Sequence, residues 1–413
     1  MKIHIIIGKN YGDEGKGLAV DYFAGTAKRR GAPVLVVRHN GGAQAGHTVD
    51  RRNGRFIFHQ LSSGSFLGAD TLWAKTFLPD LYKIEEERQH FRESFGISLN
   101  IFAEGDCRLV LIDDVLVNMA AETVRGKKRH GSCGMGINEA VNRCEDRSYA
   151  VYLKDIFGQT AEETALRMKD IRENYLPLRL KKLGVSLCEA GEYGELLQED
   201  SILLTVAEQM HRAAENIRLV DFSSERRADG SLSEEHFVYS HYGEVIFEGA
   251  QGLLLDNDRR EFYPHTTPSK TGCTNPIDFC KAYLPGEVPE IVYVTRSYVT
   301  RHGNGPLPFE MADDLFTKQI EDLTNIPNDW QGSLRFGYHE NGEAFLKYIK
   351  EDLAGVDIPY TCSLMVTHLN ETEGRLLFKE NPMEIADFME EMRREKLFSH
   401  IYLSDTRFAE DIK

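Results

Sequence analysis

The chain has 413 residues, of which 41% are hydrophobic, so it is long enough to bury a large core. Its net charge at pH 7 is −16 without a sustained basic stripe, which argues against a nucleic-acid partner because backbone phosphates are bound by clustered cations. The seven cysteines include no C-x-x-C pair, so neither a disulfide framework nor a zinc site is predicted. No run approaches the roughly 20 apolar residues of a membrane span, and no leader segment precedes the first apolar run. We therefore expect a cytoplasmic protein.

Short runs rich in isoleucine and valine alternate along the chain with longer amphipathic stretches. The short runs predict strands at Ile3–Ile7, Val34–Val37, Leu109–Ile112, Val245–Phe247, Ile291–Val294 and Leu364–Val366. The amphipathic stretches predict helices at Leu18–Arg30, Leu81–Phe95, Ile202–Leu219 and Ala344–Leu353. Together they indicate an α/β fold with a large, mostly parallel, doubly wound sheet and helices on both faces.

The chain contains no repeat, low-complexity tract or Pro/Gly-rich linker that would mark a domain boundary. We therefore expect residues 1–413 to form a single catalytic domain. The polar stretch around residues 147–235 is rich in helical patterns and predicts a helical insertion within that domain.

The first predicted strand runs into a glycine-rich turn and then a helix, in the sequence GKNYGDEGKG (residues 8–17). The glycines let backbone N–H groups approach an anion, and the helix start adds a partial positive charge, so the turn predicts a phosphate site. The glycines alone fit a structural turn equally well, but the acid and the lysine among them favour phosphate. Gly17 stands where the common P-loop has the hydroxyl residue that holds Mg²⁺, and Asp13 can supply that oxygen ligand or act as a base.

Several further blocks follow the turn in order. They are Asn40–Thr48 (NGGAQAGHT), His59–Phe66 (HQLSSGSF), Gly131–Ile137 (GSCGMGI), Phe247–Asp258 (FEGAQGLLLDND), Tyr263–Ser269 (YPHTTPS) and Thr300–Glu310 (TRHGNGPLPFE). With GDEGKG in the first turn, this series resembles the adenylosuccinate synthetase family, which joins IMP to aspartate at the expense of GTP. The resemblance covers nearly the whole chain and implies a P-loop-related fold, a purine nucleotide and an amino acid as substrates, Mg²⁺, and a homodimer.

The resemblance also assigns catalytic roles to four residues. Asp13 would withdraw the purine N1 proton and bind Mg²⁺, while His47 would stabilise charge on the transferring phosphate. Lys16 would neutralise phosphate charge, and Gln251 would bond the purine ring. For His47 a satisfied loop histidine, and for Gln251 a purely structural turn, are the alternatives.

The other expected site residues divide by ligand. The triphosphate is expected to contact Gly12, Gly15, Lys16, Gly17, Gly46, Thr48, Arg335, His368, Asn370 and Ser404, with Asp13 and the Gly46 carbonyl as Mg²⁺ ligands. The acceptor and the amino acid are expected to contact Glu14, Gln44, Ser132, Cys133, Arg147, Gln251, Thr267 and Ser333.

Two of these assignments are weakened by the chemistry of the residues present. Ser132 and Cys133 replace the family's paired threonines at the monophosphate, and a thiol is the poorer donor. Arg147 matches an arginine that reaches the partner's nucleotide across a dimer interface, although a surface ion pair explains it equally well.

The predicted amino-acid loop departs from the family. The family has a dense run of arginines there, which suits a dicarboxylate, whereas this chain reads NDWQGSLRFG (residues 328–337). Only Arg335 remains of the run, Ser333 replaces an arginine that contacts substrate, and Asp329 adds an acid. Losing one charge-assisted pair costs on the order of 1.5–3 kcal/mol. Either other groups hold aspartate, or the amine donor is a less anionic molecule.

The predicted nucleobase-reading elements have also changed. Thr367–Asn370 (THLN) stands for Thr-Lys-Leu-Asp, and Leu403–Arg407 (LSDTR) stands for a longer turn that packs on the same base. Asparagine offers no charge to guanine, so discrimination of GTP from ATP is expected to fall. The sequence thus predicts a Mg²⁺-dependent ligase of purine biosynthesis that uses GTP or ATP. A diverged relative with another amine donor or acceptor, and a nucleotide-binding regulator that lost the chemistry, are the alternatives.

Overall fold

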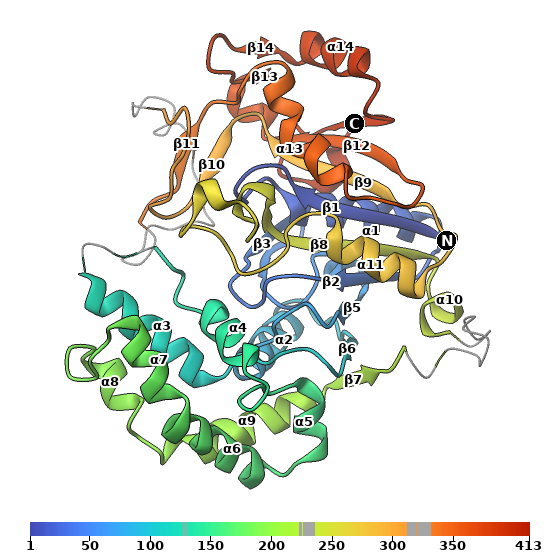
Figure 1. The fold of residues 1–413 in the computed structure, drawn as a ribbon. Coiled ribbons are helices and arrows are strands. Elements are labelled where there is room, and N and C mark those ends of the chain that lie inside the picture. Colours follow the sequence, from blue (N-terminus) through green and yellow to red (C-terminus); the bar gives the residue numbers. More distant parts are fainter. Residues whose placement is uncertain (127–128, 130, 223–224, 226–235, 312–319, 321–331) are drawn as a thin grey trace.

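The computed structural model describes residues 1–126, 129, 131–222, 225, 236–311, 320 and 332–413. A nine-stranded sheet crosses the centre of the molecule (Figure 1). All of its neighbouring strands pair in parallel, which confirms the predicted α/β fold class. From edge to edge the strands are β15 (His400–Leu403), β12 (Thr361–Thr367), β9 (Glu290–Arg296), β1 (Lys2–Gly8), β8 (Glu244–Gly252), β2 (Val34–Arg38), β5 (Asp70–Trp73), β6 (Ile101–Glu104) and β7 (Ile217–Val220).

Strand β1 lies near the middle of this sheet and is buried on both faces. Its alternate residues Ile3, Ile5 and Ile7 pack on one face with α11 (Thr274–Tyr283), α13 (Glu343–Leu353) and α14 (Ile385–Glu395). Ile6 faces the other way, into a cluster formed with α1 (Lys16–Arg29). The sequence pattern of near-continuous apolar strands is explained by this covering on both faces.

The helix-rich part of the chain lies between β6 and β7 and forms the lower part of the molecule in Figure 1. Its helices are α3 (Ile112–Arg125), α4 (Ile137–Glu145), α5 (Leu153–Gly158), α6 (Ala161–Asn174), α7 (Leu176–Leu183), α8 (Glu192–Leu196) and α9 (Ile202–Ala214). Together with α2 (Leu81–Phe95), several of them bury a second hydrophobic core. The described helices therefore begin before the predicted insertion at residue 147, and the insertion's end at residue 235 lies outside the described residues.

Two of the predicted elements are wrong in part. Residues Leu109–Ile112 were expected to form a strand, but they lead into the N-terminus of α3, where the buried carboxylate of Asp114 accepts from the Leu111 N–H. Residues 202–219 were expected to form one helix, but α9 ends at Ala214 and β7 begins at Ile217 as the sheet's edge strand. A parallel strand partner in β6 decides the second case, because its backbone bonds are available only in the folded sheet.

The described residues also form three short antiparallel ribbons, a short α-helix and several single-turn 3-10 helices. The ribbons are β3 (His47–Arg51) with β4 (Gly54–Phe58), β10 (Val299–Arg301) with β11 (Arg335–Gly337), and β13 (Arg375–Leu376) with β14 (Met383–Glu384), and the helix is α10 (Phe237–His241).

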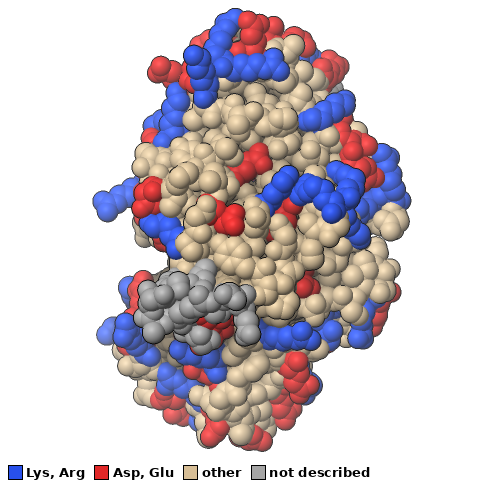
Figure 2. All heavy atoms as spheres, turned by 90° about the vertical axis from the view of Figure 1, so that its right-hand side faces the viewer, with Lys and Arg blue, Asp and Glu red and all other residues tan. Residues whose placement is uncertain are grey.

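None of the described helices has the length and apolar content that crossing a membrane requires. In Figure 2 acidic and basic side chains are intermixed over the face that is drawn, with broad uncharged areas between them.

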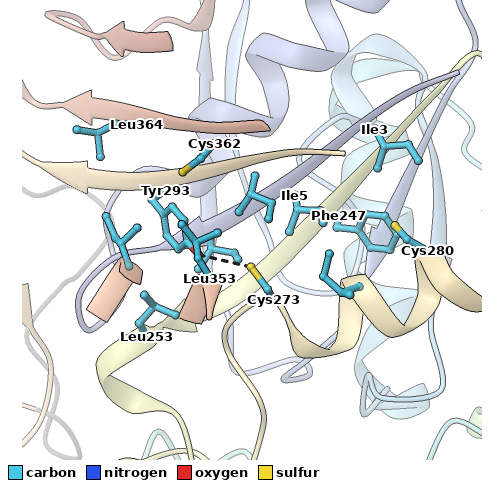
Figure 3. Close-up of a cluster of buried hydrophobic side chains, with 14 of the residues drawn as sticks. Ile3, Ile5, Phe247, Leu253, Cys273, Cys280, Tyr293, Leu353, Cys362 and Leu364 are labelled. Carbon is cyan, nitrogen blue, oxygen red and sulfur yellow. Dashed lines mark hydrogen bonds between the residues drawn. The ribbon is translucent and has the colours of Figure 1, made fainter. Parts of the chain in front are cut away.

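The largest hydrophobic cluster lies on one face of the central strands (Figure 3). Leu364 and Phe247 are fully buried there, and the Tyr293 hydroxyl lies 3.5 Å from the Cys273 thiol and donates to Asp352 at 2.7 Å. Burial raises the pKa of Cys273 well above its usual value, so this thiol stays protonated at neutral pH. Cys273 therefore packs as part of the hydrophobic core.

We predict that Leu364→Ala lowers the free energy of unfolding by about 2–5 kcal/mol, because it leaves a cavity at a fully buried position. The matched change Leu178→Ala removes the same atoms from a residue that is 65% exposed, and it should alter stability by less than about 0.5 kcal/mol. Chemical denaturation of both variants measures the difference. Equal losses would contradict the placement of Leu364 in the core.

Candidate active site

A large cavity of about 1560 Å³ opens at the carboxyl ends of the central strands. Ligands of open parallel sheets bind at this edge, where the loops after the strands converge. Its wall combines the turn after β1, the loop before β3, the end of β8, the loop between α3 and α4, and the segments after β10 and β12.

The turn between β1 and α1 has a backbone shape that depends on its glycines. Gly12, Asp13 and Gly15 all have left-handed φ angles, of 109°, 61° and 94°. The Glu14 carboxylate lies inside the turn, where it accepts from the backbone N–H groups of Asn10 at 3.0 Å and Gly12 at 2.8 Å. Lys16 donates to the same carboxylate at 2.6 Å, so an arriving phosphate meets a lysine that is already paired.

Gly17 brings the α1 helix close to the β3 strand. A Cβ atom at this position would lie 3.1 Å from the Thr48 carbonyl oxygen and 3.2 Å from the His47 Cβ. A serine or threonine would therefore crowd this contact. The replacement of the usual P-loop hydroxyl residue follows from the packing of His47 against the helix start.

The His47 ring is held by a buried carboxylate. Its Nδ1 lies 2.5 Å from Oε1 of Glu248, in the middle of β8. Glu248 also accepts from the Ser63 hydroxyl and from the Ser63 backbone N–H at 3.0 Å. Burial lowers the pKa of His47, while Glu248 opposes that effect. Burial by itself raises the pKa of Glu248, but His47, Arg38 and the Ser63 contact outweigh it and bring this pKa to about 2. Glu248 is therefore ionised and accepts the Nδ1 proton, which leaves Nε2 as the ring nitrogen for a ligand.

Asp13 lines the same cavity, and its backbone is fixed from β9 and β10. The Asp13 carbonyl accepts from the Arg296 guanidinium, and the neighbouring Gly12 carbonyl accepts from the Thr300 hydroxyl at 3.3 Å. His302 Nε2 lies 3.5 Å from the Asp13 carboxylate. Asp13 and His47 are thus brought to one cavity from segments 34 positions apart in the sequence.

Two glutamines line the cavity beside the end of β8. Gln251 has a left-handed φ of 58°, and Asn40 secures the residue before it by a pair of bonds to the Ala250 backbone, at 2.8 and 3.0 Å. The side-chain oxygens of Gln251 and Gln44 are buried without a hydrogen-bond partner among the described residues. Since such oxygens are costly to leave unpaired, they are suited to accept from a bound ligand.

The loop between α3 and α4 contains Ser132 and Cys133, both of which line the cavity. The Ser132 hydroxyl donates to Asn118 at 2.8 Å, and the backbone N–H groups of Gly131 and Ser132 point to the buried Glu122 carboxylate at 3.1 and 3.4 Å. A phosphate bound by this loop would therefore have to displace the Glu122 carboxylate from these backbone N–H groups.

At the opposite end, the segment after β12 lines the cavity with His368 and Asn370. Burial lowers the pKa of His368 well below its usual value, so the ring is neutral at physiological pH. Its Nδ1 lies 2.8 Å from the Thr367 hydroxyl, and the Asn370 side chain is exposed. The neighbouring C-terminal segment adds Thr406, Arg407 and Phe408 to the wall.

Most of the residues singled out from the sequence line this one cavity. They are Gly12, Asp13, Gly15, Lys16, Gly17, Gln44, Gly46, His47, Thr48, Ser132, Cys133, Gln251, Thr267, His368 and Asn370. The others lie elsewhere in the described chain: Glu14 is inside the turn, Ser404 is buried and donates to the Thr406 carbonyl, and Arg147 and Ser333 are exposed outside the wall. The predicted amino-acid loop up to residue 331 lies outside the described residues.

Arg335 also has a different environment from the one expected. Its guanidinium pairs with Glu310 at 2.5 Å and donates to the carbonyls of Gly303 and Gly305 at 2.8 and 2.6 Å. It therefore clamps the segment after β10 and is not among the residues of the cavity wall.

Sequence reasoning missed three residues that organise the site. Glu248 and Ser63 orient His47, and His302 lies beside Asp13. Glu248 and Ser63 lie inside the recognised blocks FEGAQG and HQLSSGSF. For Glu248 the available signal was an acidic residue directly after the predicted strand Val245–Phe247. His302 lies inside the recognised block TRHGNGPLPFE, but that block gave no indication of its neighbour Asp13, which is 289 positions away.

The adenylosuccinate synthetase family model matches residues 5–331 of the chain. The chain belongs to this family. Adenylosuccinate synthetases of Pseudomonas aeruginosa and Thermoplasma acidophilum are 28% and 27% identical to it over 326 residues, which cover 75% and 78% of this chain. The chain spans 66%, or just under two thirds, of the length of these relatives.

Two solved structures share the fold of this family member. Fully ligated adenylosuccinate synthetase from Plasmodium falciparum superposes with a TM-score of 0.70 at 16% identity, covering 100% of this chain and 99% of that one. Succinoaminodeoxyadenylate synthetase (PurZ) of cyanophage S-2L, bound to dGMP and to dATP as an energy donor, gives a TM-score of 0.63 at 15% identity over 100% of this chain and 95% of that one.

We predict that the Glu248 carboxylate stabilises the fold above its unfolded pKa and that this contribution is lost as the pH falls. Its pKa is about 2 in the folded chain and 4.5 for an ordinary glutamate, so protonation on unfolding becomes favourable between about pH 4.5 and 2. The difference in unfolding free energy between the native protein and Glu248→Gln should therefore shrink over that window. Denaturant unfolding at stepped pH measures it, and a constant difference would contradict the depressed pKa.

Proposed function

We propose that this family member is a Mg²⁺-dependent ligase that uses a nucleoside triphosphate to activate the 6-oxygen of an IMP-like purine nucleotide and couples that carbon to an amino acid. The observation that carries the proposal is the cavity that Asp13, Lys16 and His47 line together. Membership of a family of C–N bond-forming ligases supports the same reaction class.

The chemistry asks for a base and for stabilisation of charge on a transferring phosphate. Asp13 takes the N1 proton of the 6-oxopurine, so that O6 attacks the γ-phosphorus of the triphosphate and the diphosphate leaves. His47, held by Glu248 through Nδ1, donates from Nε2 to a phosphate oxygen when the ring is protonated, a form that the Glu248 carboxylate favours. The amine then adds at C6 and phosphate departs, which forms the C–N bond.

The residues present suit Mg²⁺ as the metal. Among the described residues there is no group of three or more His, Cys, Asp and Glu side chains that could hold a metal by themselves. Mg²⁺ is typically held by one or two carboxylates with substrate phosphates and water, so a single partly exposed Asp13 with the Gly46 carbonyl in the same wall fits it. When bound, Mg²⁺ would neutralise charge on the phosphate oxygens.

The nucleobase of the triphosphate is proposed to be read at Asn370, where GTP and ATP are both accepted. An exposed, uncharged amide gives guanine no charged acceptor. PurZ of cyanophage S-2L, a structural neighbour, is bound to dATP as an energy donor, which supports an adenine nucleotide as the alternative.

The amine donor is aspartate in the simplest form of the proposal. The commitment of Arg335 to Glu310 and to two backbone carbonyls favours the second form, in which the donor carries less negative charge. The protein is proposed to be a homodimer, in which Arg147, exposed and outside the wall of its own cavity, reaches the partner's site.

A phosphate-release assay tests the proposed function directly. Purified protein with Mg²⁺ is given IMP, then GTP or ATP, and a panel of amines that includes aspartate and uncharged amino acids. Release that requires both acceptor and amine supports the ligase, and the panel identifies the donor. Nucleotide binding without release for any combination would instead support a regulator that has lost the chemistry.

We predict that Asp13→Asn lowers kcat by about 10²–10⁴-fold, because an amide cannot accept the N1 proton. Asparagine keeps the shape of the side chain and tolerates the left-handed φ of 61°, so the turn should survive. Steady-state phosphate release measures the loss, with Asp170→Asn on the exposed face of α6 as the matched control. Unchanged turnover would remove Asp13 from the mechanism.

We predict that Asn370→Asp raises the preference for GTP over ATP by about 10–100-fold, since a charged acceptor strengthens hydrogen bonds from guanine. The ratio of kcat/KM for the two triphosphates is the measured quantity. Asn174→Asp adds the same charge on α6, away from the cavity, and should leave the ratio as it was. An unaltered ratio in the Asn370 variant would refute the role of this position.

A further inference from the structure

His302 lies beside the Asp13 carboxylate and has no role in the reaction as described above. Its Nε2 is 3.5 Å from Asp13 Oδ2, and both residues line the cavity. Within the described parts of the chain, His302 is the one basic side chain whose nitrogen lies within 4.0 Å of the Asp13 carboxylate. The pair joins two loops that are remote in sequence.

The backbone on either side of His302 is held firmly. The Thr300 hydroxyl donates to the Gly12 carbonyl at 3.3 Å, which ties β10 to the turn that carries Asp13. On the other side, Arg335 donates to the carbonyls of both glycines in the Gly303-Asn-Gly305 segment. The imidazole is therefore presented to Asp13 by a fixed support.

The surroundings of His302 differ from those of a histidine that serves the fold. His4, for comparison, pairs both ring nitrogens, with Glu290 at 2.9 Å and Glu244 at 3.1 Å. His302 Nδ1 is buried and has no hydrogen-bond partner among the described residues. An unpaired buried nitrogen costs about 1–3 kcal/mol, so this ring is not placed for the stability of the loop.

We propose that His302 is a positioning residue that holds the Asp13 carboxylate in the orientation that proton transfer requires. The inference rests on the proposed function, in which Asp13 is the base. Nε2 donates to Oδ2, which leaves Oδ1 free to take the acceptor's proton. Such contacts are often long in a site without ligands and shorten in the substrate complex, and a base displaced by 1 Å can lose about 100-fold in rate.

Two variants separate positioning from packing. His302→Ala removes the contact and should lower kcat about 10–100-fold, while KM for the triphosphate changes less than about twofold. His302→Gln keeps an N–H donor at a similar reach and should recover most of kcat. His241→Ala, on α10, is the control, and thermal unfolding checks that each variant is folded. Equal activity of the Ala and Gln variants, or a loss confined to KM, would overturn the proposal.

A second measurement decides the matter without turnover. In crystals grown with IMP, Mg²⁺ and GDP, the native Asp13 carboxylate should adopt one orientation within 3.2 Å of His302, and it should adopt several in His302→Ala. A single unchanged orientation in the variant would refute the positioning role. If the native protein releases no phosphate with any amine, the proposed function fails. The crystals would then still show whether His302 orients the Asp13 carboxylate.

Discussion

The site depends first on a carboxylate buried inside the turn after β1. Glu14 accepts two backbone N–H groups and the Lys16 ammonium, and so it shapes the turn from within. The space for it exists because a Cβ atom at Gly8 or at Gly252 would come within 2.3–2.6 Å of the Glu14 oxygens. Asp13, which has a left-handed φ of 61°, lines the cavity next to this turn.

A second constraint is that charged side chains around the cavity are already paired with neighbouring residues. Glu248 is ionised because His47 and Arg38 offset its burial, and its contact with His47 Nδ1 fixes the orientation of the imidazole in the site. Arg335 is similarly committed to Glu310 and to the loop after β10. The cavity thus keeps groups suited to a triphosphate, while the one surviving arginine of the amino-acid loop serves the support of His302.

Much of the fold and part of the site were predictable, because their signals are local. Apolar strands followed by amphipathic helices predicted the parallel sheet, the glycine turn predicted a phosphate site at Asp13 and Lys16, and the family resemblance added His47. The strand expected at Leu109–Ile112 failed because its apolar residues pack at a helix start, and the last turns of the helix expected at Ile202–Leu219 failed because β6 offered a strand partner. Both misses are cases in which tertiary pairing overrode the local pattern.

The sequence by itself determined the family, the parallel class of the sheet and the chemical types gathered at the first turn, since these rest on short motifs and on periodicity. Only the tertiary structure decided which side chains reach the cavity. Glu14 and Arg335 belong to the expected set by sequence, yet contacts with their neighbours turn both away from it. His302 enters the site for the opposite reason, because its distance to Asp13 is created by β10 and β1 folding against one another, and no local pattern encodes a contact across 289 positions.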